Sequence, residues 1–199
     1  VDWSLWAAEL DMINKHITVT KEKIADATSF YEELANHLVN KLKWERNDIS
    51  IFPQGSSSTQ TLINSPDRSK FDIDAVCEVN ISRVDANNPM SFYDNIGMAL
   101  KEYNPERKKR CWCINNAGRD YYIEFTPSTP LATVPTSIRS SIRYLAAQQY
   151  EDTALAVVNT PTKSWKTSNP KGFTSWVDTQ AKRSVDRFRL LESQSKFAA

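Results

Sequence analysis

Residues 71–81 read FDIDAVCEVNI, and this stretch is the clearest indication of the fold in the sequence. Apolar residues occupy every odd-numbered position, whereas the even-numbered positions include Asp72, Asp74 and Glu78. A period of two is typical of a β-strand with one buried face, because successive side chains point to opposite sides of a strand. The stretch therefore predicts a half-buried strand whose polar face carries acidic side chains.

Asp72 and Asp74 are the sharpest chemical feature of this strand. Residues two apart point to the same side, so the two side chains start roughly 7 Å apart and are held on a rigid element. Magnesium suits this arrangement, because it prefers one or two carboxylates together with the phosphates of a substrate. A solvated strand face without any metal has the same spacing, so further residues must support a site.

A second feature lies upstream of the acidic strand. The apolar run 49–52 leads into Gln54 and the stretch 55–59 (GSSST), which predicts a strand, a tight turn and the start of a helix. Backbone N–H groups at such a turn bind phosphate oxygens, and Gly55 admits their close approach. We expect Gln54 and Ser56 to add hydrogen bonds to the phosphate. The alternative interpretation is a flexible surface loop.

A third acid is needed if two metal ions are to be bridged during phosphoryl transfer. The run 121–125 (YYIEF) alternates like a strand, and Asp120 and Glu124 fall on the same face of it. Alternation alone does not choose between them. Asp120 adjoins the turn, whereas Glu124 lies within the strand, so we assign Glu124 as the third acid. We expect it to converge with Asp72 and Asp74 on adjacent strands.

The rest of the chain alternates between helical and strand-like patterns. Apolar residues recur every three or four positions from residue 24 to 42, which predicts an amphipathic helix with Thr20 as its N-cap. The further expected elements are a helix at 92–100, strands at 111–114 and 154–158, a loop at 127–135, a helix at 137–149 and a final helix at 177–191. Together they predict an α+β fold in which helices flank a mixed sheet.

Charge and composition narrow the range of functions. The 199 residues include 25 Lys and Arg against 24 Asp and Glu, so the chain has no overall field to attract nucleic acid or an anionic membrane. No apolar run approaches the roughly 18 residues of a membrane span, and we expect a cytoplasmic protein. Three cysteines and two histidines, of which only Cys111 and Cys113 are closely spaced, do not favour zinc. The basic run 107–110 is interpreted as a solvated strand edge.

Four ordered segments resemble a known group of enzymes. They are residues 54–56 (QGS), 71–76 (FDIDAV), 122–127 (YIEFTP) and 165–173 (WKTSNPKGF). These segments look like the catalytic core of the polymerase-β-type nucleotidyltransferases. Within that superfamily they are most similar to the cGAS/DncV-like nucleotidyltransferases (CD-NTases) of bacterial anti-phage signalling. The resemblance runs from the helix near Thr20 to about Trp176 and implies the polymerase-β-type core.

The resemblance implies an enzyme that couples nucleoside triphosphates into cyclic di- or trinucleotides, which activate a partner effector. It also implies Mg²⁺ as the cofactor, with Mn²⁺ as the alternative ion. Asp72 and Asp74 would hold both metal ions, and Glu124 would hold the ion that activates the attacking ribose hydroxyl. The residues at the donor triphosphate would be Gln54, Gly55 and Ser56. Neither a membrane nor a nucleic acid is expected as a partner.

Two features depart from the family pattern. Many members carry Asp where this chain has Glu124, which is longer by one methylene. Members also continue into a second, largely helical lobe. We therefore expect residues 1–176 to be the catalytic core of a longer protein and residues 177–199 to lead toward such a lobe. Two other interpretations stay open: a nucleotidyltransferase that acts on RNA or protein, and a non-catalytic nucleotide-binding or interaction module.

Overall fold

A seven-stranded sheet forms the centre of the computed structural model, which describes residues 3–64, 70–142 and 148–197. The strands are β1 (Ile49–Pro53), β2 (Phe71–Val79), β3 (Glu106–Arg107), β4 (Trp112–Ile114), β5 (Tyr121–Pro130), β6 (Leu155–Asn159) and β7 (Ser164–Ser168). The helices are α1 (Trp3–Ile17), α2 (Lys21–Leu42), α3 (Gly55–Ser58), α4 (Pro89–Ala99), α5 (Thr136–Arg139) and α6 (Pro170–Phe197). Short 3₁₀ helices lie at Arg46–Asp48, Ile81–Arg83, Lys101–Tyr103, Leu131–Thr133 and Gln148–Thr153.

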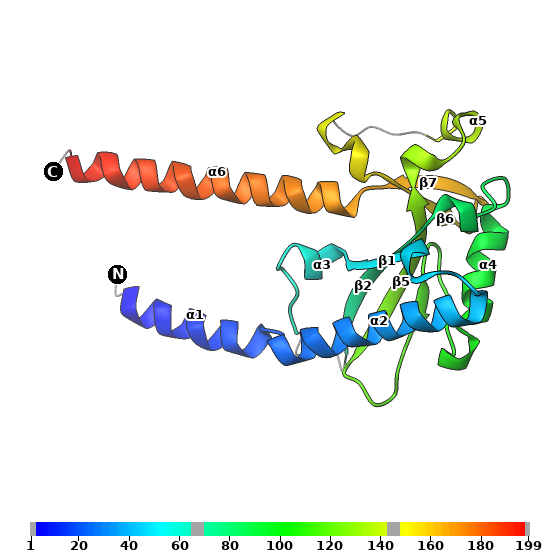
Figure 1. The fold of residues 1–199 in the computed structure, drawn as a ribbon. Coiled ribbons are helices and arrows are strands. Elements are labelled where there is room, and N and C mark those ends of the chain that lie inside the picture. Colours follow the sequence, from blue (N-terminus) through cyan, green and yellow to red (C-terminus); the bar gives the residue numbers. More distant parts are fainter. Residues whose placement is uncertain (1–2, 65–69, 143–147, 198–199) are drawn as a thin grey trace.

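The sheet is mixed, as predicted. Its order is β1-β2-β5-β4-β3, and β6 also pairs with β5 and continues to β7. The central strands β2 and β5 run parallel, whereas every other neighbouring pair is antiparallel. Helices pack against this sheet, so the α+β class is confirmed (Figure 1). The parallel central pair places the acidic strand β2 beside the strand that carries Glu124.

One face of the sheet forms the hydrophobic core with α2 and α4. Along β2, the odd-numbered residues from 71 to 79 are buried, as the alternation predicts. Helix α2 begins where the sequence indicated, because the Thr20 side chain accepts a hydrogen bond from the Lys23 N–H. The buried residues of α2 are Ala27, Phe30, Tyr31, Leu34, Ala35 and Leu38. Helix α4 contributes Phe92, Tyr93 and Ile96 to the same core.

Strand β5 is longer than predicted and includes residues 127–130, which were assigned to a loop. Pro127 and Pro130 lie within it. Strand β4 pairs with residues 123–125 of β5 and β6 pairs with residues 128–130, so Pro127 lies at the gap between these two partners. A proline is tolerated at such an interrupted edge, because its missing N–H removes no ladder hydrogen bond on that side.

Two other boundaries differ from the predictions. Helix α6 begins at Pro170 rather than at 177, because proline suits the first turn of a helix, where its missing N–H has no partner to lose. Part of the predicted helix at 137–149 lies outside the described residues, and the described part is α5 followed by a 3₁₀ helix. Strand β7, which pairs with β6 along its full length, was not predicted.

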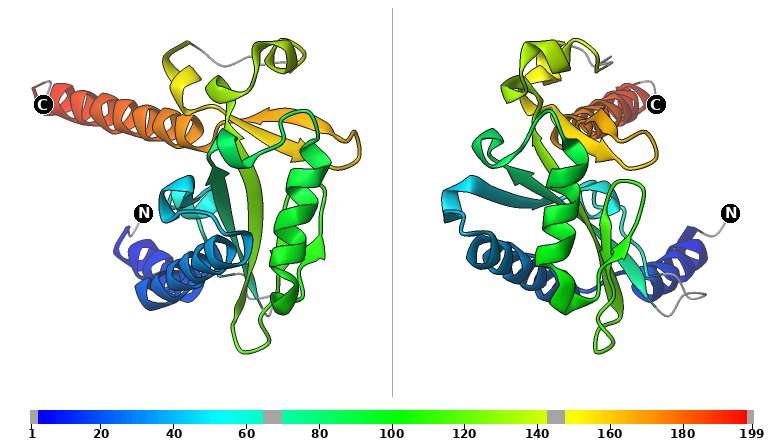
Figure 2. Two further views of the ribbon diagram at one scale, coloured as in Figure 1. Left: turned by 45° about the vertical axis from the view of Figure 1, so that its right-hand side comes forward. Right: turned by 90° about the vertical axis from the view of Figure 1, so that its right-hand side faces the viewer.

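Helices α1 and α6 project from the same side of the sheet, with α3 between them (Figures 1 and 2). Both carry exposed large apolar side chains, among them Leu10 on α1 and Phe188 on α6. None of the helices in the described residues is both long and apolar enough to cross a lipid bilayer.

Candidate active site

The three acids proposed from the sequence lie on the face of the sheet opposite the core. Asp74 and Glu124 are direct partners in the parallel register of β2 and β5, and Asp72 lies two residues before Asp74. In-register residues of neighbouring strands point to the same side. All three are partly exposed, whereas Ile73 and Ile123 on the other face are buried.

The charge of this cluster is unfavourable in the absence of a cation. Burial, and after it the neighbouring charges of Asp72 and Glu124, raise the pKa of Asp74 from its ordinary value of 3.8 to about 6. Asp74 therefore lies close enough to both acids to feel their repulsion. A divalent cation at this face would relieve it, since carboxylate oxygens are the ligands that magnesium prefers.

The acids share a face but do not meet at a single point. Among residues 3–64, 70–142 and 148–197, no three His, Cys, Asp or Glu side chains are gathered tightly enough to hold a metal ion. The predicted convergence of Asp72, Asp74 and Glu124 within a few ångströms is therefore not seen.

Asp120, the other acid considered for the third position, points elsewhere. Its carboxylate forms an ion pair with Lys23 of α2, and its backbone carbonyl accepts a hydrogen bond of 3.1 Å from the Phe71 N–H. Asp120 is thus held at the start of β5 against the helical layer. Of the two acids, Glu124 is the one beside Asp74.

The turn after β1 lies directly against the acidic strand. The Gln54 N–H donates a hydrogen bond of 2.9 Å to the Asp74 carbonyl. Gly55 follows with a φ of 60°, and a Cβ atom there would lie only 2.4 Å from Asp74 Oδ2. Two features favour glycine at this position. Its backbone has a left-handed conformation, which side chains disfavour, and the Asp74 carboxylate occupies the space that a Cβ atom would fill. The Gln54 side chain donates to Thr126 Oγ1 of β5 at 3.2 Å.

Ser56 and Asp72 line one hollow of about 300 Å³ beside α3. Lys70 also lines it, and its ammonium donates hydrogen bonds of 2.7 Å to the Asn115 side chain and the Asn116 carbonyl. The next serine, Ser57, has a buried hydroxyl without a hydrogen-bond partner. The start of α3 therefore offers the Ser56 hydroxyl in a hollow that Asp72 also lines.

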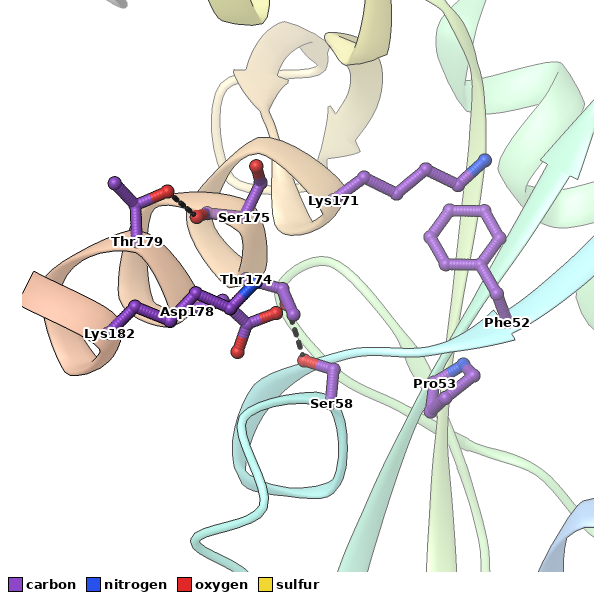
Figure 3. Close-up of a pocket in the computed structure, with 9 residues that line it drawn as sticks. All are labelled: Phe52, Pro53, Ser58, Lys171, Thr174, Ser175, Asp178, Thr179 and Lys182. Atoms are coloured by element: carbon purple, nitrogen blue, oxygen red, sulfur yellow. Dashed lines mark hydrogen bonds between the residues drawn. The ribbon is translucent and has the colours of Figure 1, made fainter. Parts of the chain in front are cut away.

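A second hollow, of about 430 Å³, lies between the end of β1, α3 and the start of α6 (Figure 3). Thr174 of α6 donates a hydrogen bond of 2.9 Å to Ser58, which ties the two helices together. Lys171 lies 4.0 Å from the centre of the Phe52 ring and 3.5 Å from Glu78. Two hollows lined by hydroxyl and lysine side chains therefore adjoin α3.

Cys111 is a neighbour of the site that sequence reasoning missed. Its thiol donates a hydrogen bond of 3.4 Å to Glu124 Oε2. Burial, and after it the charge of Glu124, raise the pKa of Cys111 well above its ordinary value, so the sulfur keeps its proton. The C-x-C spacing put Cys111 and Cys113 on one face, but only the pairing of β4 with β5 brings that face to Glu124.

Several solved structures share the fold. CD-NTase CdnG of Bradyrhizobium diazoefficiens, in complex with GTP, matches 81% of this chain and 43% of its own, at 18% identity and a TM-score of 0.60. The cyclic AMP-GMP synthase DncV of Vibrio cholerae, with a linear intermediate, matches 86% and 59%, at 13% identity and a TM-score of 0.59. The STING-associated c-di-GMP synthase CdnE of Capnocytophaga granulosa matches 82% and 48%, at 14% identity and a TM-score of 0.55.

These similarities establish the fold rather than the reaction, because all three identities are below 20%. The chain spans 43 to 59% of the length of these three structures. No family model and no curated protein sequence matches the chain.

Proposed function

We propose that this chain, which has the cGAS/DncV-like nucleotidyltransferase fold, couples nucleoside triphosphates into a cyclic di- or trinucleotide. The observation that carries the proposal is the contact between the G-S turn and the acidic strand. Gly55 lies against Asp74, which itself pairs with Glu124. A phosphate-binding turn and three carboxylates on one rigid face are the parts that metal-dependent phosphoryl transfer requires.

The carboxylates of Asp72, Asp74 and Glu124 would hold Mg²⁺, or Mn²⁺ as the alternative. Their donor chemistry fits, because magnesium takes a few carboxylate oxygens and completes its shell with substrate phosphates. Bound magnesium offsets the negative charge that develops on the transferring phosphoryl group. Asp72 and Asp74 stand two apart on one strand, which fixes their spacing, and Glu124 approaches from the neighbouring strand.

The turn at residues 54–56 would hold the donor triphosphate. The side chain of Gln54 is anchored on Thr126, which fixes the turn relative to β5. Gly55 leaves the backbone uncovered, and Ser56 presents a hydroxyl in the hollow that it shares with Asp72. The residues of this chain therefore position and neutralise the phosphates, and no nucleophilic side chain is needed.

The products would be second messengers that activate a separate effector protein in bacterial anti-phage signalling. The related structures are of enzymes that form a cyclic AMP-GMP or a cyclic di-GMP. We extend that activity to this chain on the basis of the shared fold and of the acidic face. Nucleoside triphosphates are accordingly the substrates, and the cytoplasm is the compartment in which such a signal acts.

The test is to incubate the protein with labelled nucleoside triphosphates and Mg²⁺ and to separate the products by chromatography. We expect cyclic products that resist phosphatase, and none from the Asp72→Ala/Asp74→Ala variant. Asp120→Ala is the matched control, because it removes an acid that is paired with Lys23 instead of one on the acidic face. We expect this variant to form the same cyclic products as the wild-type protein. Reactions with added RNA or a carrier protein identify a different acceptor. Product formation by the double variant would refute the assignment of the acids.

A further inference from the structure

Cys111 is fixed in place by hydrogen bonds to its backbone. The Tyr93 hydroxyl donates to the Cys111 carbonyl at 2.5 Å, and the Lys108 N–H donates to the same carbonyl at 3.0 Å. Tyr93 is itself fully buried in α4 and its ring stacks on Trp112, the next residue of the chain. The Cys111 side chain is therefore attached to a rigid part of the core rather than to a mobile loop.

The thiol of Cys111 binds one of the two oxygens of Glu124, at 3.4 Å. A glutamate has three side-chain torsions, and a hydrogen bond to one carboxylate oxygen restricts the last two of them. Glu124 is the register partner of Asp74, so its carboxylate lies on the face that carries Asp74. Cys113 is the register partner of Glu124, but among the described residues it makes no hydrogen bond to that carboxylate.

We propose that Cys111 is a positioning residue, whose thiol orients the Glu124 carboxylate for cation binding. The inference rests on the proposed function, since it treats Glu124 as a metal-holding acid. Groups that hydrogen-bond to a metal ligand orient it, and their loss typically lowers metal affinity about 10- to 100-fold. A thiol is a weak donor, so the lower end of that range applies.

The test measures Mn²⁺ binding directly, by electron paramagnetic resonance of the free ion in the presence of ATP, and in parallel the Mg²⁺ concentration for half-maximal coupling. We expect Cys111→Ala to weaken both by about tenfold. Cys111→Ser keeps a hydrogen-bond donor and should remain near the wild-type values. Cys113→Ala is the matched control, because it removes a thiol of the same size from the same face. Thermal unfolding checks that each variant is folded.

A double-mutant cycle with Glu124→Ala separates positioning from a general loss of structure. If Cys111 acts through Glu124, adding Cys111→Ala to Glu124→Ala should change Mn²⁺ affinity no further. Wild-type Mn²⁺ affinity in Cys111→Ala would overturn the proposal, as would additive losses in the cycle. If Cys111→Ser does not fold, the cycle alone decides. An inactive wild-type protein would count against the proposed function, whereas the Mn²⁺ titrations would still test the role of Cys111.

Discussion

Gly55 is the residue at which the turn after β1 touches the acidic strand β2. We predict that Gly55→Ala destabilises the protein by about 2 to 4 kcal/mol, since alanine must adopt a left-handed backbone and its Cβ meets a carboxylate oxygen. The Cβ would lie 2.4 Å from Asp74 Oδ2, so the Asp74 side chain must turn away. Activity should fall by more than the loss of folded protein explains. Urea unfolding and coupling rates measure the two effects.

Gly118→Ala is the control for that substitution. Its Cβ would meet only Asn116 Oδ1, at 3.6 Å, which is an ordinary contact. It should leave both stability and activity close to those of the wild-type protein. A Gly55→Ala protein that also matched the wild type would show that the turn is not held against Asp74.

Asp74 gives a prediction about pH. Its pKa of about 6 in the folded protein lies above its ordinary value of 3.8, so ionisation opposes folding. Below pH 3.8 the group is protonated in both states, and as pH rises through 6 the wild-type protein loses stability. Without metal at pH 8, Asp74→Asn should therefore be more stable by about 1 to 2 kcal/mol, after allowance for solvent screening. The difference should shrink steadily as pH falls from 6 toward 3.8.

Thermal unfolding between pH 4 and pH 8 in the presence of a chelator checks this prediction. Asp120→Asn is the control, because it removes a carboxylate that is paired with Lys23 rather than one that lies beside other acids. Equal unfolding temperatures for Asp74→Asn and the wild type at pH 8 would show that ionisation of Asp74 does not destabilise the folded protein.

The sequence best predicted the orientation of single side chains where the alternation along one strand determines which face of the sheet they occupy. Alternation along 71–81 identified which side of the strand Asp72 and Asp74 occupy. The proximity of Glu124 to Asp74 depends on the register of two strands that lie about fifty positions apart in the sequence. No pattern within either strand determines that register, so the sequence could only suggest that the two acids are neighbours. The contact of Cys111 with Glu124 requires a second register, between β4 and β5, so no local pattern indicated it.

Helix α4 is attached to the sheet at Gly97, which lies under the Trp112 indole of β4. A Cβ at this position would lie 2.1 Å from Trp112 Cζ2. We predict that Gly97→Ala destabilises the protein by about 1 to 3 kcal/mol, because the helix or the ring must move in a packed core. Tyr93 on the same helix holds the Cys111 backbone, so Mn²⁺ affinity should fall with stability.

A smaller side chain at Trp112 tests whether the clash with Gly97→Ala causes the loss of stability. The double variant Gly97→Ala/Trp112→Leu should be more stable than the sum of the two single effects predicts, because leucine leaves room for the added methyl group. Chemical denaturation of the four proteins measures the coupling. Strict additivity would mean that the contact between α4 and β4 does not limit packing.

Among the elements, long amphipathic patterns were predicted well and interrupted ones were not. Helix α2 and strand β2 have one continuous apolar stripe each, and both were found. Strand β5 continues through Pro127 because two different antiparallel partners flank that point, and only the tertiary arrangement reveals the gap. Strand β7 is short, and its polar and apolar residues alternate only weakly. Its strand conformation follows from its pairing with β6, which its own sequence does not indicate.

The whole molecule consists of a packed sheet domain and two long helices that extend from it. All described side chains from 181 to 190 of α6 are exposed, and so are those from 6 to 16 of α1. Contiguous apolar side chains on an exposed surface mark a site of contact with other chains or segments. The related structures are longer than this chain, which matches 43 to 59% of their length.

The last prediction concerns association of the 199-residue chain. Leu10 and Phe188 are 62% and 69% exposed, so neither contributes much to folding. We expect the chain to self-associate as its concentration rises, and Leu10→Glu/Phe188→Glu to reduce this, because apolar surface is replaced by charge. Stability should stay within about 0.5 kcal/mol, as is usual for exposed positions. Arg187→Glu is the control, since it changes charge beside Phe188 without removing apolar surface. Sedimentation velocity measures the effect, and a wild-type chain that stays monomeric at high concentration would show that these helix faces do not drive association.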